Sequence, residues 1–330
     1  MNEFNEMTAP LIDISKEELT ELSKIKETFL SKAMLLIDKE QTSPINLVDI
    51  YPKTNNVNEL YTQISDLKKC LDSFRPFDKY QMKHLNEIFD TEYTYASNRI
   101  EGNTLTLKET SFVINEGLTI QNKSMKDHLE AINHKGAIDF IREMVDNKEP
   151  LNERNIKLIH SLILQGIDRE NAGVYRGVSV GIKGTHIIFP EPFIVPKMME
   201  DLMVYYEAEK NNLHPIALAT QMHSRLVNIH PFIDGNGRTS RLVMNLILLQ
   251  HGYPVTIFEP EEDNRDVYFN ALNIAREQQN IEDFELFVMN NVKRWMFKYL
   301  SLLAPNISEG SKNKGYYFFK KIEPSLKNEL

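Results

Sequence analysis

Residues 230–241 read HPFIDGNGRTSR, and this stretch decides how the chain is interpreted. An apolar run from Leu242 to Leu249 follows directly, so the sequence predicts a polar loop that opens into a buried helix. The first turn of such a helix offers free backbone N–H groups and the positive end of the helix dipole, which together favour a bound phosphate. The stretch therefore indicates a nucleotide-handling site.

Four side chains in this stretch suit phosphate transfer. Asp234 offers a carboxylate, and Mg²⁺ commonly binds through one or two carboxylates, with substrate phosphates and water completing its shell. Arg238 and Arg241 stand three apart at a helix start, so they share a face and can fork onto phosphate oxygens. His230 precedes the loop and is the expected general base, because the ordinary pKa of histidine lies near ~6.5.

The three residues between them shape the loop. Gly235 and Gly237 permit turn conformations and a close approach to a ligand. Asn236 stands between them, so its side-chain NH₂ and the neighbouring backbone N–H groups can converge on an anion. Each residue taken singly also has a structural explanation as a turn former, a core group or a solvated face. Their joint occurrence at one helix start favours a site.

The composition is that of an ordinary globular protein. The chain has 330 residues, 42% apolar and 26% charged, which is enough for one large or two modest domains. A net charge of −9 argues against direct nucleic-acid binding. Cys70 is the single cysteine, so no internal disulfide is expected. The polar, acidic amino terminus is unlike a signal peptide, and no apolar run approaches the ~20 residues that cross a bilayer. We expect a cytoplasmic protein without membrane contact.

Helical periodicity dominates the chain. Helices are predicted over residues 16–40, 58–71, 78–97, 106–115, 124–147, 152–165, 196–211, 215–228, 237–251, 264–279 and 281–300. Residues 171–196 interrupt this pattern, because four glycines punctuate short β-branched pieces in the manner of a β-hairpin. The fold class is therefore mainly α, with one hairpin placed as a flap before the polar loop.

Residues 230–241 resemble the signature of the Fic family, His-x-Phe-x-Asp/Glu-Gly-Asn-Gly-Arg-x-x-Arg, at every specified position. The helical pattern from about residue 97 to 300 also resembles the Fic fold, a helical bundle with a β-hairpin flap beside the active-site loop. The resemblance implies an amino-terminal helical region at 1–96, a Fic catalytic domain at 97–303 and a polar tail at 304–330. It also implies a protein adenylyltransferase, which transfers AMP from ATP to a Ser, Thr or Tyr hydroxyl.

The resemblance assigns roles within the loop. His230 would deprotonate the hydroxyl, and Asp234 would hold Mg²⁺. Asn236 and the adjacent backbone of Gly235 and Gly237 would hold the α-phosphate, while the arginines 238 and 241 would hold the β- and γ-phosphates. Related Doc kinases have Lys in place of Gly237, so glycine favours nucleotidyl over phosphoryl transfer.

An upstream motif suggests restraint of the enzyme. Ser97, Glu101 and Gly102 match the Fic inhibitory pattern Ser/Thr-x-x-x-Glu-Gly/Asn, and a helix end capped by glycine is the structural alternative. A helix that ends at Glu101 could present its carboxylate to Arg241 in place of a phosphate, because the two pairs share their geometry. The sequence therefore predicts an autoinhibited enzyme.

Further contacts follow from the family's flap and nucleoside-binding segment. The flap would pair with an extended segment of a target protein, and its expected tip, which could also touch the nucleotide, comprises Lys183, Gly184, Thr185 and His186. Tyr268 and Arg276 would face the nucleoside, although Tyr268 is equally explained as a core aromatic. UMP, phosphocholine or phosphate as the transferred group, a non-catalytic Fic scaffold, and homodimerisation through the amino-terminal helices stay open.

Overall fold

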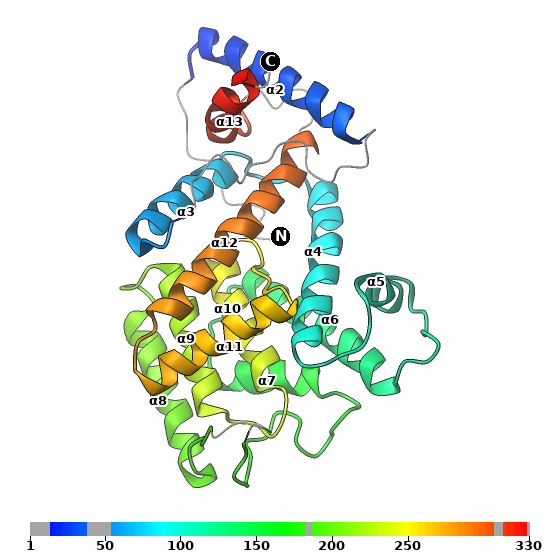
Figure 1. Cartoon of the computed structure of the whole chain (residues 1–330), viewed down its shortest axis with the longest axis vertical. Helices are drawn as coiled ribbons and strands as arrows, with labels where there is room; N and C mark the ends of the chain where they lie inside the picture. The colour runs from blue at the N-terminus through cyan, green and yellow to red at the C-terminus, as the bar shows by residue number, and fades with distance from the viewer. Residues whose placement is uncertain (1–13, 38–53, 182–186, 307–312, 329–330) are drawn as a thin grey trace. The chain divides into compact units, whose positions relative to one another are not determined.

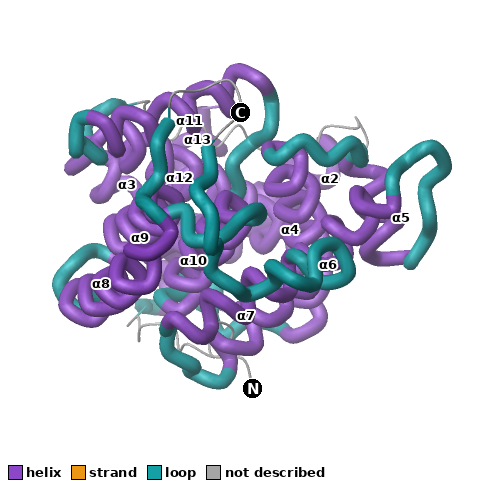
Figure 2. Tube along the Cα trace, turned by 90° about the horizontal axis from the view of Figure 1, so that it is seen from below, coloured by secondary structure: helices purple, strands orange, loops and turns teal. Residues whose placement is uncertain are grey.

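The computed structural model describes residues 14–37, 54–181, 187–306 and 313–328. Throughout these ranges the chain is helix and loop, without a strand (Figures 1 and 2). The helices are α2 (Lys16–Ile37), α3 (Val57–Asp72), α4 (Lys79–Ile100), α5 (Leu107–Glu116), α6 (Met125–Asp146), α7 (Glu153–Ile163), η2 (Pro192–Ile194), α8 (Val195–Glu209), α9 (Pro215–Ile229), α10 (Asn236–Gln250), α11 (Glu262–Glu277), α12 (Glu282–Leu303), η3 (Ala304–Asn306) and α13 (Tyr316–Asn328). The mainly α prediction is confirmed.

Side-chain caps explain why several helices begin where the periodicity placed them. Ser15 accepts a hydrogen bond from the backbone N–H of Glu18 at the start of α2. Thr106 and Ser124 each form a capping box, at the starts of α5 and α6. Asn152 caps α7 through the N–H of Asn155. Each cap satisfies a donor that the first helical turn leaves without a partner.

The chain divides into two compact units, Met1–Glu87 with Met289–Leu330, and Ile88–Val288. The first contains α2, α3 and α13, and the second contains every residue of the 230–241 loop and of the upstream motif. The division into domains at 96/97 and 303/304 stays a prediction.

Helix α13 is absent from the sequence-based assignment, which treated residues 304–330 as a polar tail. Its apolar face is short, and the lysines and Pro324 beside it are not typical of a buried helix. Phe318 and Phe319 are buried and make edge-on contacts with Phe29 of α2. Both rings also contact Phe74, which follows α3. The tail therefore contributes to the core of the first unit.

We expect Phe319→Ala to lower the free energy of unfolding by about 3–5 kcal/mol, because a fully buried aromatic side chain leaves a cavity. Tyr317→Ala is the matched control, since this ring is 37% exposed. Urea unfolding followed by circular dichroism measures both. Equal midpoints for the two variants would contradict the assigned packing.

Helix α10 forms the centre of the second unit, where it contacts α6, α7 and α9 (Figure 1). Every residue from Arg238 to Leu249 is buried, as expected for a helix without a polar face. Three of its buried polar side chains are paired within the core. The Thr239 and Ser240 hydroxyls donate to carbonyls four residues earlier. The side chain of Asn245 pairs with the backbone of Thr256. The loop at residues 230–235 is thus attached to a rigid core.

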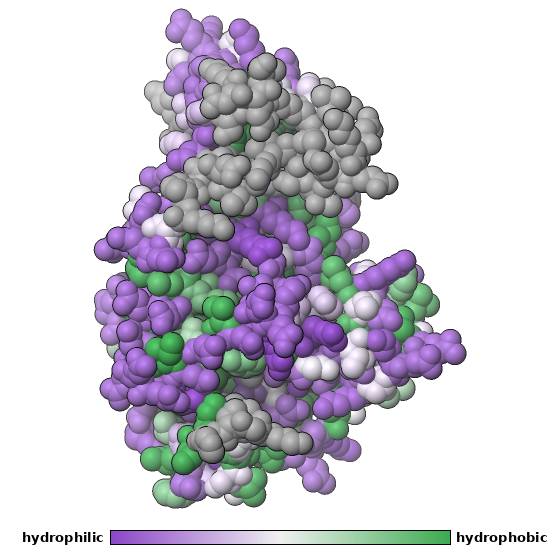
Figure 3. All heavy atoms as spheres, viewed as in Figure 1, coloured by the Kyte–Doolittle hydropathy of each residue, from purple (hydrophilic) through white to green (hydrophobic). Residues whose placement is uncertain are grey.

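On the face shown in Figure 3, hydrophilic residues cover most of the coloured surface and apolar residues are scattered among them. Among the described helices, each is too short or too polar to cross a membrane.

Candidate active site

His230 ends helix α9 in a left-handed conformation, with φ 50° and ψ 60°. The following Pro231 disfavours right-handed helical backbone at this position, so the helix stops here. The ring stacks on Phe189 with 3.8 Å between centroids. Nδ1 lies 3.3 Å from the carbonyl of Val227, which favours the tautomer whose lone pair is on Nε2. Burial lowers the pKa of His230 to about 4, so the ring is a neutral base at pH 7.

Asp234 has an accessible carboxylate, with its side chain 52% exposed. Its Oδ1 accepts the N–H of Gly235 at 2.6 Å and lies 3.5 Å from Arg238 Nη2. The described residues hold no cluster of three or more metal-binding side chains. One accessible carboxylate fits Mg²⁺, because this ion takes most of its ligands from phosphates and water. It does not fit a cation whose ligands all come from the protein.

The start of α10 is open to an anion. Gly235 precedes the helix in a left-handed conformation, with φ 77°, and no side chain caps the first turn. The Asn236 side chain also holds the loop together, and its role at the α-phosphate stays a prediction. Its amide donates to the carbonyl of Phe232 and accepts the N–H of the same residue, each at 2.9 Å. Asn236 thus closes the loop, and the backbone N–H groups are left to face an anion.

Arg238 is buried beside carboxylates that leave part of its guanidinium unpaired. Its Nη1 lies 3.2 Å from Glu130 Oε1 of α6, but neither Nε nor Nη1 has a hydrogen-bond partner among the described residues. Buried donors without partners are costly, so this guanidinium has capacity for further acceptors.

Arg241 is held by the last turn of α4. Nε donates to Ser97 Oγ at 3.0 Å, and Nη2 donates to the Ser97 carbonyl at 2.8 Å and to Glu101 Oε1 at 2.7 Å. Glu101 also lies over the first turn of α10, because a Cβ added at Gly237 would clash with its Oε1. The carboxylate therefore occupies the side of the helix start at which an anion would be expected.

The turn after α4 is fixed from a second side. Gly102 ends it in a left-handed conformation with φ 98°, which suits glycine. Asn103 then donates to Glu130 Oε2 at 2.9 Å, and Asn98 donates to the Glu130 carbonyl at 3.2 Å. Glu130 thus joins the turn that carries Glu101 to Arg238. Glu130 was not predicted from the sequence, because one glutamate on an amphipathic helix does not by itself indicate a role at a site.

Tyr268 belongs to the core. Its ring is 2% exposed, and its hydroxyl lies 3.0 Å from His223 Nε2 and 3.4 Å from Arg241 Nη1. This burial fits the explanation of Tyr268 as a core aromatic, and a contact with the nucleoside stays a prediction. Arg276 donates to Asn273 in its own helix.

Of the expected flap, the described parts on either side form no strand, and the tip residues Lys183, Gly184, Thr185 and His186 lie outside the described residues. The segment is nevertheless attached to the loop, because the backbone N–H of Arg176 donates to the Pro231 carbonyl at 2.9 Å.

A buried histidine that the sequence analysis missed braces the other end of the loop. His160 of α7 stacks on Phe232 with 3.6 Å between centroids and an interplanar angle of 4°. Its Nδ1 accepts the N–H of Gly173, so Nε2 carries the proton and donates to the Asp234 carbonyl at 2.9 Å. A Cβ at Gly235 would lie 3.4 Å from this ring, so the loop backbone passes directly beside His160.

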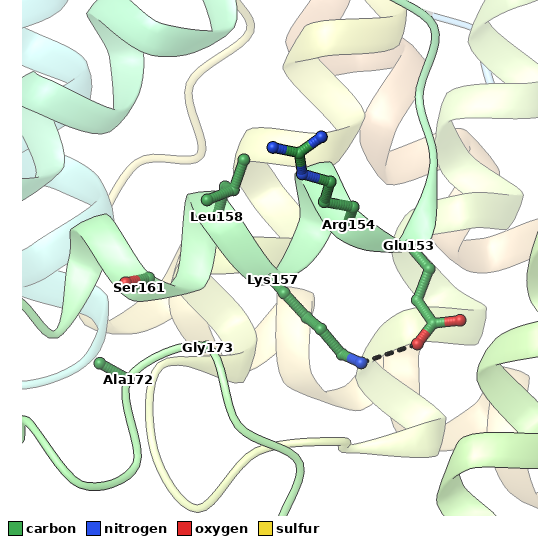
Figure 4. A pocket seen from close by; sticks show the side chains of 7 residues that line it. All are labelled: Glu153, Arg154, Lys157, Leu158, Ser161, Ala172 and Gly173. Carbon is green, nitrogen blue, oxygen red and sulfur yellow. Dashed lines mark hydrogen bonds and ion pairs between the residues drawn. The ribbon is translucent and has the colours of Figure 1, made fainter.

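A surface pocket lies on the outer side of α7 (Figure 4). It is lined by Glu153, Arg154, Lys157, Leu158, Ser161, Ala172 and Gly173. Lys157 is paired with Glu153 at 2.8 Å. None of the residues expected at the active site lines this pocket.

Comparison with known proteins identifies the family. The Fic/DOC family model matches residues 150–248. A crystal structure of a Fic domain containing signaling protein from Bacteroides thetaiotaomicron is 30% identical, with a TM-score of 0.64 over 76% of this chain and 98% of that one. The chain belongs to the Fic/DOC family.

Two further relatives agree with this assignment. A Fic family protein from Desulfovibrio desulfuricans is 25% identical, with a TM-score of 0.61 and 76% of each chain covered. The protein adenylyltransferase Fic of Drosophila grimshawi is 33% identical over 210 residues, which are 63% of this chain. The match spans 42% of that relative's length.

Acid should weaken the fold through His160. Burial lowers its pKa to about 4 from an ordinary 6.5. Between pH 6.5 and pH 4, His160 is therefore protonated in the unfolded chain but neutral in the native chain. The free energy of unfolding then falls with pH by up to about 1.4 kcal/mol per unit for this group. We expect His160→Gln to remove that share of the slope, measured by urea unfolding from pH 7 to 4.5. Parallel pH dependences of the two proteins would contradict the assignment.

Proposed function

We propose that this Fic/DOC protein transfers AMP from ATP to a hydroxyl of a target protein or of itself. The observation that carries the proposal is the meeting, at one uncapped helix start, of a neutral histidine, an open carboxylate and two buried arginines. The adenylyltransferase name of the curated relatives supports the nucleotide donor.

In the proposed reaction, His230 Nε2 takes the proton of a Ser, Thr or Tyr hydroxyl. The hydroxyl oxygen bonds to the α-phosphorus, the bond from that phosphorus to the bridging oxygen breaks, and pyrophosphate leaves. The backbone N–H groups of Gly237 and Arg238 stabilise charge on the α-phosphate. Asp234 would hold Mg²⁺, which neutralises phosphate charge. Arg238 and Arg241 bind the outer phosphates.

The resting enzyme is restrained by Glu101. Its carboxylate takes the Arg241 donor that a γ-phosphate needs and crowds the approach to Gly237. ATP that binds beside it is misaligned for attack at the α-phosphorus. An extended segment of the target would pair with the flap between Val178 and Phe193, which would register its hydroxyl over His230.

Labelled ATP tests the transfer directly. Incubation of wild type and of Glu101→Gly with ATP labelled at either the α or the γ position should give protein-bound label from the α position alone. His230→Ala should abolish it, because no general base is left. Label from the γ position would indicate phosphoryl transfer, and no label from either would favour another donor or a binding role. Either result would refute adenylylation.

Removing the carboxylate should release activity. Since charge-assisted hydrogen bonds contribute about 1.5–3 kcal/mol, we expect Glu101→Gly to raise the rate of AMP transfer about 10- to 100-fold at saturating ATP. Glu116→Gly is the matched control, because this glutamate is exposed at the end of α5. Equal rates for wild type and Glu101→Gly would remove the inhibitory role.

Ser97 should make a smaller contribution. Its hydroxyl accepts a hydrogen bond from Arg241 Nε, but its carbonyl contact to the same guanidinium survives substitution. We therefore expect Ser97→Ala to raise the transfer rate about fivefold or less. A larger increase than that of Glu101→Gly, in the same assay, would show that Ser97 and not the carboxylate restrains Arg241.

A further inference from the structure

Arg176 is buried at the base of the 174–191 segment, with 2% of its surface exposed. Its guanidinium donates to three backbone carbonyls. Nε donates to His230 at 2.8 Å, Nη1 to Val178 at 3.0 Å, and Nη2 to Pro190. Val178 and Pro190 stand on the two arms of the segment, so one side chain connects both arms to the expected general base.

These contacts are unusual for a buried arginine. Within the described residues no carboxylate lies within ion-pair distance of Arg176, and every one of its side-chain hydrogen bonds ends on the main chain. The planar fork of a guanidinium can serve several carbonyls in fixed directions, whereas the ammonium of lysine cannot. The arrangement is therefore specific for backbone geometry.

The backbone that Arg176 holds is strained. His230 is a non-glycine residue with a φ of 50°, a conformation that persists only where its surroundings impose it. Its N–H is fixed by the Leu226 carbonyl. Its carbonyl is fixed by the Arg176 side chain, and the next carbonyl, that of Pro231, by the Arg176 backbone. Arg176 thus supplies two of the three hydrogen bonds made by the backbone groups of His230 and Pro231.

We propose that Arg176 is a positioning residue, which holds His230 in the conformation required for catalysis and registers both arms of the 174–191 segment against it. Since its side-chain hydrogen bonds all end on backbone carbonyls, we assign it no contact with the phosphates or the target hydroxyl. Its loss should therefore slow proton removal and leave nucleotide binding, which depends on α10, nearly intact. This inference rests on the proposed role of His230 as general base.

The test compares Arg176→Lys with its parent, both carrying Glu101→Gly. We expect the turnover of AMP transfer to fall about tenfold or more. The affinity for Mg²⁺-bound α,β-methylene ATP, measured by calorimetry, should stay within about twofold.

The ring Cε1–Hε1 resonance of His230, measured by NMR, should shift in Arg176→Lys. Ethylguanidinium should restore part of the turnover of Arg176→Ala.

Arg154→Lys is the matched control, since this arginine is exposed on α7 and should leave turnover, affinity and resonance as in the parent. Turnover of Arg176→Lys within about twofold of the parent would overturn the proposal. A loss of ATP affinity in the same proportion as turnover would also overturn it, because that indicates a general structural role.

Two measurements keep the outcomes separate. If the Glu101→Gly parent transfers no AMP, the proposed function fails, and the His230 resonance alone decides whether Arg176 positions the ring. If Arg176→Lys does not fold, the arginine Nε–H of the parent is measured by hydrogen exchange. A slowly exchanging Arg176 Nε–H supports the contact to the His230 carbonyl, and a rapidly exchanging one overturns it.

Discussion

The start of α10 imposes the main electrostatic constraint on this protein. Its first turn has no side-chain cap, and the first two turns carry two buried guanidinium groups, those of Arg238 and Arg241. Such a concentration of positive charge away from water has to be balanced by anions. Glu101 and Glu130 supply the balance, each from a different helix or turn. The 97–103 segment and the buried face of α6 therefore lie where their carboxylates can balance the buried positive charge of α10.

The fold was predictable wherever burial is periodic. Apolar stripes located the helices, whereas α13 escaped because its apolar face spans few residues beside Pro324. The ion pair between Arg241 and Glu101 was predictable as well, because a short motif marks both partners. The described arms of the expected hairpin carry no strand, so glycine spacing alone overstated the β-structure.

The supporting residues were not predictable, and the reason is physical. His160 and Arg176 act on backbone carbonyls of Asp234 and His230, and a carbonyl is present at every position of a chain. No residue type at the receiving end can therefore reveal such a contact. The amide of Asn236 shows a further limit: its residue type suggested an anion ligand, but did not reveal that both of its polar atoms also bond to the backbone of Phe232.

The carboxylate of Glu101 and the guanidinium of Arg241 belong to one polypeptide and one compact unit. Their encounter is unimolecular, so it has an effective concentration set by the chain and not by how much protein is present. Dilution leaves such a competitor in place. Under the proposed function, ATP would compete with Glu101 at this effective concentration for its phosphates to reach Arg241. The ratio of protein with Arg241 paired to Glu101 to protein with Arg241 bound to phosphate would then depend on the ATP concentration and not on the amount of enzyme.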